Sequence, residues 1–203
     1  EAAEANPAVE RVTVKALDLM KKLMRSAVET GTPFIFFRDT VNRANPNKHD
    51  GMIYASNLCH EIAQNMSESQ LLSETAVTRD GQPEVLLRLK AGDMVTCNLN
   101  SINLSRVPKD ELQKVIPLQI RMLDNVITLN QLPVQEARLT SDKYRAIGLG
   151  TSGYHHMLAN RHIAWESQEH VRYADELFEE IAFQAISASM QLAKEKGPYP
   201  VFK

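Results

Sequence analysis

Asn57, Cys59 and Glu61 place an amide, a thiol and a carboxylate at alternate positions of the chain. If this stretch is extended, its side chains alternate between two faces, so these three share one face while Leu58 and His60 take the other. Three different chemistries then point at one spot. The alternative is an ordinary half-buried strand, because free cysteine is among the most buried residue types. These residues alone leave both interpretations open.

The residue types of this trio suit a proton transfer combined with a hydrogen-atom transfer. A glutamate such as Glu61 is a carboxylate at neutral pH and can accept a proton as a general base. Asn57 offers a donor and an acceptor without a charge, which suits the orientation of a substrate hydroxyl. A cysteine outside a special environment is a neutral thiol at neutral pH, the form that holds a sulfur-bound hydrogen. We expect His60 to be a loop or core-edge histidine, because it faces away from Cys59 in the extended form.

The motif lies within a series of short blocks whose order is typical of one enzyme family. The blocks occupy positions 30–34, 39–46, 56–62, 97–104, 145–150 and 193–197. In this order they resemble the catalytic large subunit of ribonucleotide reductase, most closely the bacterial aerobic class I ribonucleoside-diphosphate form. The resemblance extends over nearly the whole chain, and the central block is similar to the radical-cysteine loop of that family.

The resemblance implies a role for each member of the trio. Cys59 would become a thiyl radical and remove the hydrogen from the 3'-carbon of a ribose, which makes the loss of the 2'-hydroxyl feasible. Glu61 would take the proton of the 3'-hydroxyl, and Asn57 would orient the ribose hydroxyls. Leu58 and Leu99 match positions near the bound nucleotide, so both are expected to contact it.

Cys97 matches one of the two reducing cysteines of the family, which form a disulfide as the 2'-hydroxyl leaves as water. Its partner cysteine is not in this chain, which has two cysteines in all. Cys59 and Cys97 show no metal-ligand spacing, and the adjacent His155 and His156 have no partner one helical turn away. We therefore expect no metal site in this segment.

By resemblance, the segment has a helix-rich α/β fold and forms part of a ten-stranded α/β barrel, whose central finger loop carries the radical cysteine. The substrate would be a ribonucleoside diphosphate. No cofactor is expected on the segment itself, because a metal-containing small subunit supplies the radical and a thioredoxin- or glutaredoxin-type protein supplies the electrons. The full-length large subunit is expected to form a homodimer. Subunits of this family are several times longer, so we expect an internal piece of the catalytic domain that reduces no nucleotide alone.

Composition is consistent with this assignment. With 203 residues, 43% hydrophobic residues and a net charge of −2, the chain can bury one substantial core and has no charge excess that would recruit nucleic acid or a membrane surface. It contains neither a long apolar run nor a signal-peptide pattern, so we expect a cytoplasmic protein. One partial catalytic barrel domain is expected across 1–203.

Hydrophobic periodicity predicts the elements that position these residues. Amphipathic helices are expected over 7–29, 107–127, 152–160 and 167–196. Pro117 should kink or restart the second of these helices, and Gly197 should end the last. Short strands are expected at the motif and over 34–37, 94–104 and 146–149. The polar stretch 64–92 predicts a surface excursion with a turn at Gly81.

Gly148, Gly150 and Gly153 form a G-x-G-x-x-G string after a predicted strand. No acidic residue follows at the distance that dinucleotide binding requires, so we expect close packing of a strand on a helix instead. Tyr144, Tyr154, Tyr173 and Tyr199 are interpreted as structural, because none matches the radical-relay tyrosines of the family.

Two alternatives remain open from the sequence. In a related class of reductase, adenosylcobalamin generates the same thiyl radical on a similar loop. A second alternative is a non-catalytic helical interaction module, in which Cys59 and Cys97 are inert and buried apart. Either reductase hypothesis predicts that the two sulfurs approach each other near a cleft.

Overall fold

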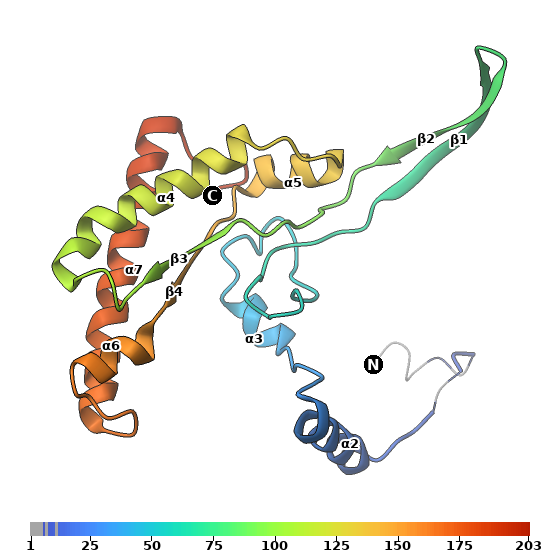
Figure 1. The fold of residues 1–203 in the computed structure, drawn as a ribbon. Helices are drawn as coiled ribbons and strands as arrows, with labels where there is room; N and C mark the ends of the chain where they lie inside the picture. The colour runs from blue at the N-terminus through green and yellow to red at the C-terminus, as the bar shows by residue number, and fades with distance from the viewer. Residues whose placement is uncertain (1–5, 7, 11) are drawn as a thin grey trace. The chain divides into compact units, whose positions relative to one another are not determined.

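A computed structural model describes residues 6, 8–10 and 12–203. The chain divides into two compact units, Glu1–Phe37 and Arg38–Lys203 (Figure 1). Among the described residues, no helix is long and apolar enough to cross a membrane.

Among its described residues, the first unit contains one helix, α2 (Ala16–Thr30). It ends at Gly31, whose φ of 75° lets its N–H bond to the Ala27 carbonyl. The prediction that this helix starts near position 7 is wrong, because residues 12–15 are not helical; positions 7 and 11 lie outside the described residues. The β-branched run at 12–14 explains the late start, since such side chains lose rotamer freedom in a helix.

The strand predicted over 34–37 is absent, and this stretch is irregular up to the first residue of α3 (Arg38–Arg43). An apolar run becomes a strand only where another strand satisfies its backbone hydrogen bonds. None of the described strands pairs with these residues.

The second unit is built on two parallel strands, β3 (Leu99–Asn103) and β4 (Gly148–Ser152). Their register aligns Leu99 with Gly148 and Asn103 with Ser152. Parallel strands need a long crossover, and here it consists of η1 (Lys109–Glu111), α4 (Leu112–Leu129) and α5 (Gln135–Tyr144). After β4 follow α6 (Tyr154–Asn160) and α7 (Gln168–Lys196). The observed fold is therefore mixed α/β and rich in helix.

The core lies where α4 and α7 pack together beside β3 and β4 (Figure 1). Its largest fully buried side chains come from a strand and three helices: Ile102, Leu112, Ile116, Leu158 and Leu177. Burial of such aliphatic side chains stabilises a fold by about 1.5–3 kcal/mol each.

The helices predicted over 107–127, 152–160 and 167–196 lie close to the observed α4, α6 and α7, whereas α5 was not predicted. The Ser167 hydroxyl caps α7 by accepting a hydrogen bond from the His170 N–H at 3.0 Å, and α7 ends at Gly197, where φ is 87°. Of the two outcomes predicted at Pro117, a restart of the helix is wrong, because α4 runs through this residue as one helix.

The glycine string allows β4 to approach its neighbours closely. A Cβ atom at Gly148 would collide with the Leu99 side chain, and one at Gly150 would lie 3.0 Å from Ser101 Oγ. The tight packing is thus mainly between β4 and β3, whereas the sequence suggested a strand against a helix.

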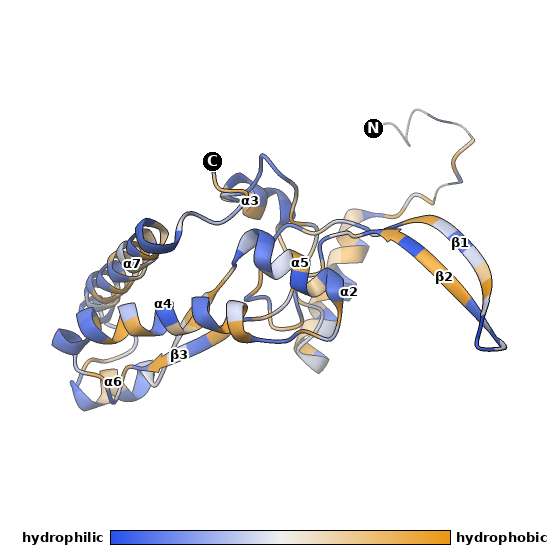
Figure 2. Ribbon diagram, turned by 90° about the horizontal axis from the view of Figure 1, so that it is seen from above, coloured by the Kyte–Doolittle hydropathy of each residue, from blue (hydrophilic) through white to orange (hydrophobic). Residues whose placement is uncertain are grey.

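Residues 70–90 form an antiparallel hairpin of β1 (Gln70–Arg79) and β2 (Gln82–Lys90). Asp80 and Gly81 connect the strands with φ values of 51° and 76°, as a two-residue hairpin turn with left-handed positions requires. None of its residues is buried. Hydrophobic residues are prominent along β2 (Figure 2), and Leu89 of this strand shares a face with Leu71 of β1 because the two residues are paired.

Candidate active site

The trio lies on a loop, and the strand predicted at the motif is wrong. Leu58 and Cys59 form a turn, closed by a hydrogen bond of 3.2 Å from the His60 N–H to the Asn57 carbonyl. His60 has a φ of 65°, in the left-handed region. The simple alternation of faces therefore does not hold here, because a turn reverses the chain between Asn57 and Glu61.

The Asn57 side chain fixes this turn. Its Oδ1 accepts a hydrogen bond from the Ile62 N–H at 3.1 Å, and the neighbouring Ser56 hydroxyl donates to the Ile62 carbonyl at 2.6 Å. Asparagine side chains commonly bond to nearby backbone in this way, in competition with regular structure. Cys59 and Leu58 are exposed at the tip. From the sequence, Asn57 is predicted only to contact substrate, so its structural role in the turn is a finding of the structure.

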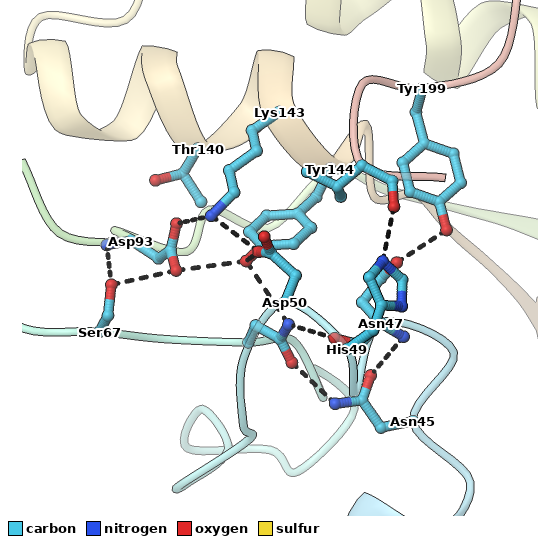
Figure 3. Close-up of polar contacts among 12 residues, drawn as sticks. Asn45, Asn47, His49, Asp50, Ser67, Asp93, Thr140, Lys143, Tyr144 and Tyr199 are labelled. Carbon is cyan, nitrogen blue, oxygen red and sulfur yellow. Dashed lines mark hydrogen bonds and ion pairs between the residues drawn. The ribbon is translucent and has the colours of Figure 1, made fainter. Parts of the chain in front are cut away.

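Residues 45–66, called the motif loop below, are closed at the base by buried asparagines (Figure 3). Asn45 Nδ2 donates to Asn65 Oδ1 at 2.7 Å, and Asn65 Nδ2 donates to the Asn47 carbonyl at 2.9 Å. Asn47 Oδ1 in turn accepts a hydrogen bond of 2.7 Å from the Tyr199 hydroxyl, which follows α7. The ends of the motif loop are thereby held by one another and by the C-terminal segment.

A second group of contacts joins the motif loop to α5. The Tyr144 hydroxyl donates to Asp50 Oδ2 at 2.6 Å, and Lys143 Nζ bridges Asp50 and Asp93 (Figure 3). The hydrogen bond from Tyr144, with that from Lys143, holds the pKa of Asp50 below its ordinary value. Burial and the bond to Asp50 raise the pKa of Tyr144. Burial opposes the charge of Lys143, yet its contacts with Tyr144, Asp50 and Asp93 outweigh burial and raise its pKa. At neutral pH the group therefore contains a neutral phenol between charged partners.

A cleft of about 650 Å³ lies beside the motif loop, at the start of β3 and β4 and near the C-terminal ends of α4 and α7. Glu61 and Leu99 line it together. Cys97 lines a smaller cavity of about 60 Å³, and Asn98 lines both cavities. Glu61 and Leu99 thus line the larger cavity, and Cys97, in the segment just before β3, lines the smaller one.

The remaining predicted site residues lie outside these cavities. Asn57, Leu58 and Cys59 line neither of them. Both cysteines are exposed, so the burial expected for an inert module does not hold. Among the described residues, no cluster of three or more histidine, cysteine or acidic side chains could hold a metal ion.

An ion network forms one wall of the cleft. Arg145 Nε and Nη2 lie 2.9 and 2.7 Å from Asp124 Oδ1, and Lys196 Nζ lies 2.6 Å from Asp124 Oδ2. Burial would disfavour the charge of Asp124, but the hydrogen bonds from Lys196 and Arg145 outweigh burial and hold its pKa below the ordinary value. The network joins α4 to α7 and to Arg145, which directly follows α5, and no spacing in the sequence predicts it.

This geometry is that of an α/β segment in which a thiol-bearing loop borders a cleft, and a second cysteine lines a smaller cavity that shares Asn98 with the cleft. The family model described as the ribonucleotide reductase barrel domain matches residues 1–203. The chain therefore belongs to the ribonucleotide reductase large-subunit family.

Curated relatives support the same family. The chain is 50% identical over 197 residues to the ribonucleoside-diphosphate reductase subunit alpha of Treponema pallidum, covering 96% of this chain and 23% of that protein. It is 38% identical over 234 residues to the protein of that name from Helicobacter pylori, covering 98% and 30%. It is 31% identical over 201 residues to the ribonucleoside-diphosphate reductase large chain of Encephalitozoon cuniculi. The chain spans less than a third of the length of the first two relatives.

Proposed function

We propose that this chain supplies the radical-cysteine loop of a ribonucleoside-diphosphate reductase, with the motif loop as the finger inside a ten-stranded α/β barrel. The observation that carries the proposal is the exposed thiol of Cys59 at the tip of a turn. The Asn57 side chain stabilises this turn through its hydrogen bond with the Ile62 N–H. Glu61, on the same loop, lines a cleft of about 650 Å³. A reactive atom at the tip of a loop with a fixed base can enter a cavity without losing its position.

In the proposed reaction, the thiyl radical of Cys59 takes the hydrogen atom from the 3'-carbon and becomes a thiol. Glu61 accepts the 3'-hydroxyl proton, and the 2'-hydroxyl leaves as water after it gains a proton. Cys97 and a second cysteine outside this chain supply two electrons and two protons and form a disulfide. One of these protons leaves in the water, the other becomes part of the new hydrogen on the 2'-carbon, and Glu61 returns its proton to the 3'-oxygen. The 3'-hydrogen then returns from Cys59, which regenerates the thiyl radical. Asn57 presents its amide to the ribose while its Oδ1 holds the turn, and Leu58 and Leu99 contact the nucleotide.

The partners follow from the same proposal. A metal-containing small subunit supplies the radical, and a thioredoxin- or glutaredoxin-type protein reduces the disulfide. The full-length subunit forms a homodimer in the cytoplasm and makes deoxyribonucleotides for DNA replication. The names of the relatives, which specify ribonucleoside-diphosphate reductase, favour this version over one that depends on adenosylcobalamin.

The test compares two thiol replacements in the full-length subunit, assayed with its small subunit. Cys59→Ser should abolish both turnover and the release of 3'-hydrogen from a 2'-substituted nucleotide, because an oxygen–hydrogen bond is too strong for the same atom transfer. Cys97→Ser, the matched control, should block reduction but keep the 3'-hydrogen release, since Cys97 acts only after the radical has reached the ribose. Release of 3'-hydrogen by Cys59→Ser but not by Cys97→Ser would reverse the two roles.

A further inference from the structure

Two acidic side chains from different segments meet at the end of α5 (Figure 3). Asp50 belongs to the motif loop, and Asp93 belongs to the segment that leads into Cys97. Lys143 Nζ lies 2.9 Å from Asp50 Oδ2 and 3.0 Å from Asp93 Oδ1. The Tyr144 hydroxyl lies 2.6 Å from Asp50 Oδ2 and 3.3 Å from Asp93 Oδ2. One end of α5 therefore joins the two segments that carry the cysteines.

The same helix holds the segment before β3 at two further points. The Met94 N–H donates to Thr140 Oγ1 at 2.8 Å, and the hydroxyls of Thr96 and Ser141 lie 2.9 Å apart. Thr140 is buried. The segment that contains Cys97 is thus held on α5 by several hydrogen bonds. Because the motif loop also contacts α5, this helix sets the position of the loop relative to that segment.

Charge makes this junction sensitive to each of its members. Asp50 and Asp93 are both anionic partners of Lys143, and their side chains retain only 26% and 12% of their exposure. Without the lysine, two carboxylates would face one hydroxyl and repel each other in partly buried surroundings. Without the Tyr144 hydroxyl, Asp50 would lose its shortest contact, and its ion pair with Lys143 would be its remaining contact with α5.

We propose that Tyr144 and Lys143 are positioning residues, which clamp the motif loop through Asp50 against the segment before Cys97. The proposal rests on the proposed function, because it gives these residues a task in the thiol chemistry. Neither residue touches the reacting atoms. Their effect is on the placement of Cys59, and misplacement of a reacting group by about 1 Å can slow a reaction about 100-fold.

The test uses the full-length subunit with Tyr144→Phe, which removes a single hydroxyl. Tyr154→Phe is the matched control, because the buried Tyr154 hydroxyl has no hydrogen-bond partner among the described residues. Tyr144→Phe should lower kcat about 10- to 100-fold and leave KM within about twofold of the parent value. Backbone amides of residues 47–66 should exchange hydrogen faster, while those of α4 and α7 keep the parental rate. Tyr154→Phe should match the parent in all of these measurements.

Two results would overturn the clamp. One is a Tyr144→Phe variant whose kcat and whose amide hydrogen exchange over residues 47–66 both equal those of the parent. The other is a loss of kcat accompanied by faster exchange throughout α4 and α7, which would indicate general destabilisation. Asp50→Ala, which removes the acceptor of the Tyr144 hydroxyl, should reproduce the Tyr144→Phe result if the contact itself matters. Exchange of the motif loop is measured without substrate, so it reports on the clamp even if the thiol replacements disprove the proposed function.

Discussion

Asn45 and Asn65 hydrogen bond to each other across the base of the motif loop, with 2.7 Å between Asn45 Nδ2 and Asn65 Oδ1. Their exposures are 5% and 2%, so water cannot replace this bond. Asn65 also donates to the Asn47 carbonyl at 2.9 Å. Because a buried polar group without a partner is strongly unfavourable, the pair determines where the loop begins and ends.

Asn65→Ala should lower the free energy of unfolding of this chain by about 1–3 kcal/mol, because it leaves the side-chain amide of Asn45 without its acceptor and removes one hydrogen bond to the Asn47 carbonyl. Urea denaturation measures the change. Asn160→Ala, at an exposed position in the last turn of α6, is the matched control and should change stability by less than about 0.5 kcal/mol. Equal losses in both variants would show that the buried pair has no special role.

Acidification should weaken the network around Asp124. Its pKa is lower in the folded chain than its ordinary value, so the ionised carboxylate stabilises the fold above the ordinary carboxyl pKa of about 4. That stabilisation is lost as the pH falls through the lower folded-state pKa. Asp50, whose pKa is also lowered, adds a dependence of the same sign.

The unfolding free energy of the parent should therefore decrease between about pH 5 and pH 3 more steeply than that of Asp124→Asn. Asp110→Asn removes an exposed carboxylate in η1 and leaves the Lys196 and Arg145 contacts in place. This control should keep the steep slope of the parent. If Asp124→Asn kept that slope too, the network would not be a source of the acid sensitivity.

Local signals made α7 predictable from the sequence. Ser167 caps its start and Gly197 ends it, and a long apolar period lies between them. The strand prediction for residues 57–61 was wrong for an equally local reason. Alternating polar residues favoured a strand, but Asn57 bonds to the Ile62 N–H and stabilises a turn instead. The preference of asparagine for turns was the signal that could have predicted it.

Contacts between residues that are far apart in the sequence could not be predicted from it. Tyr144 and Asp50 are 94 positions apart, and no spacing rule connects a helix end to a loop at that distance. Tyr144 was interpreted as structural, which its burial supports, but its bond to Asp50 depends on how α5 meets the motif loop. The missing strand at 34–37 reflects the same limit, because an apolar run reveals nothing about whether a neighbouring strand exists.

Gly153→Ala should test the close packing beside β4. Gly153 has a φ of 68°, and a Cβ atom there would meet Asn103 Oδ1 and lie 3.1 Å from Ser105 Oγ. Gly81 has a φ of 76° with nothing within 4 Å, so Gly81→Ala carries only the cost of a left-handed backbone, about 1 kcal/mol. Gly153→Ala adds overpacking of about 1–3 kcal/mol to that cost. Urea denaturation should show the larger loss for Gly153→Ala, and equal losses would mean that the contact with Asn103 relaxes freely.

Glu61→Gln should separate proton transfer from binding in the full-length subunit. The replacement keeps the size and hydrogen-bonding capacity of the side chain but removes the base, so kcat should fall about 10²- to 10⁴-fold if Glu61 accepts the 3'-hydroxyl proton. Glu68→Gln is the control, because Glu68 is exposed and lines neither of the two cavities beside the motif loop. It should retain the kcat of the parent. Steady-state turnover with a ribonucleoside diphosphate measures both variants, and full activity in Glu61→Gln would assign the proton to another acceptor.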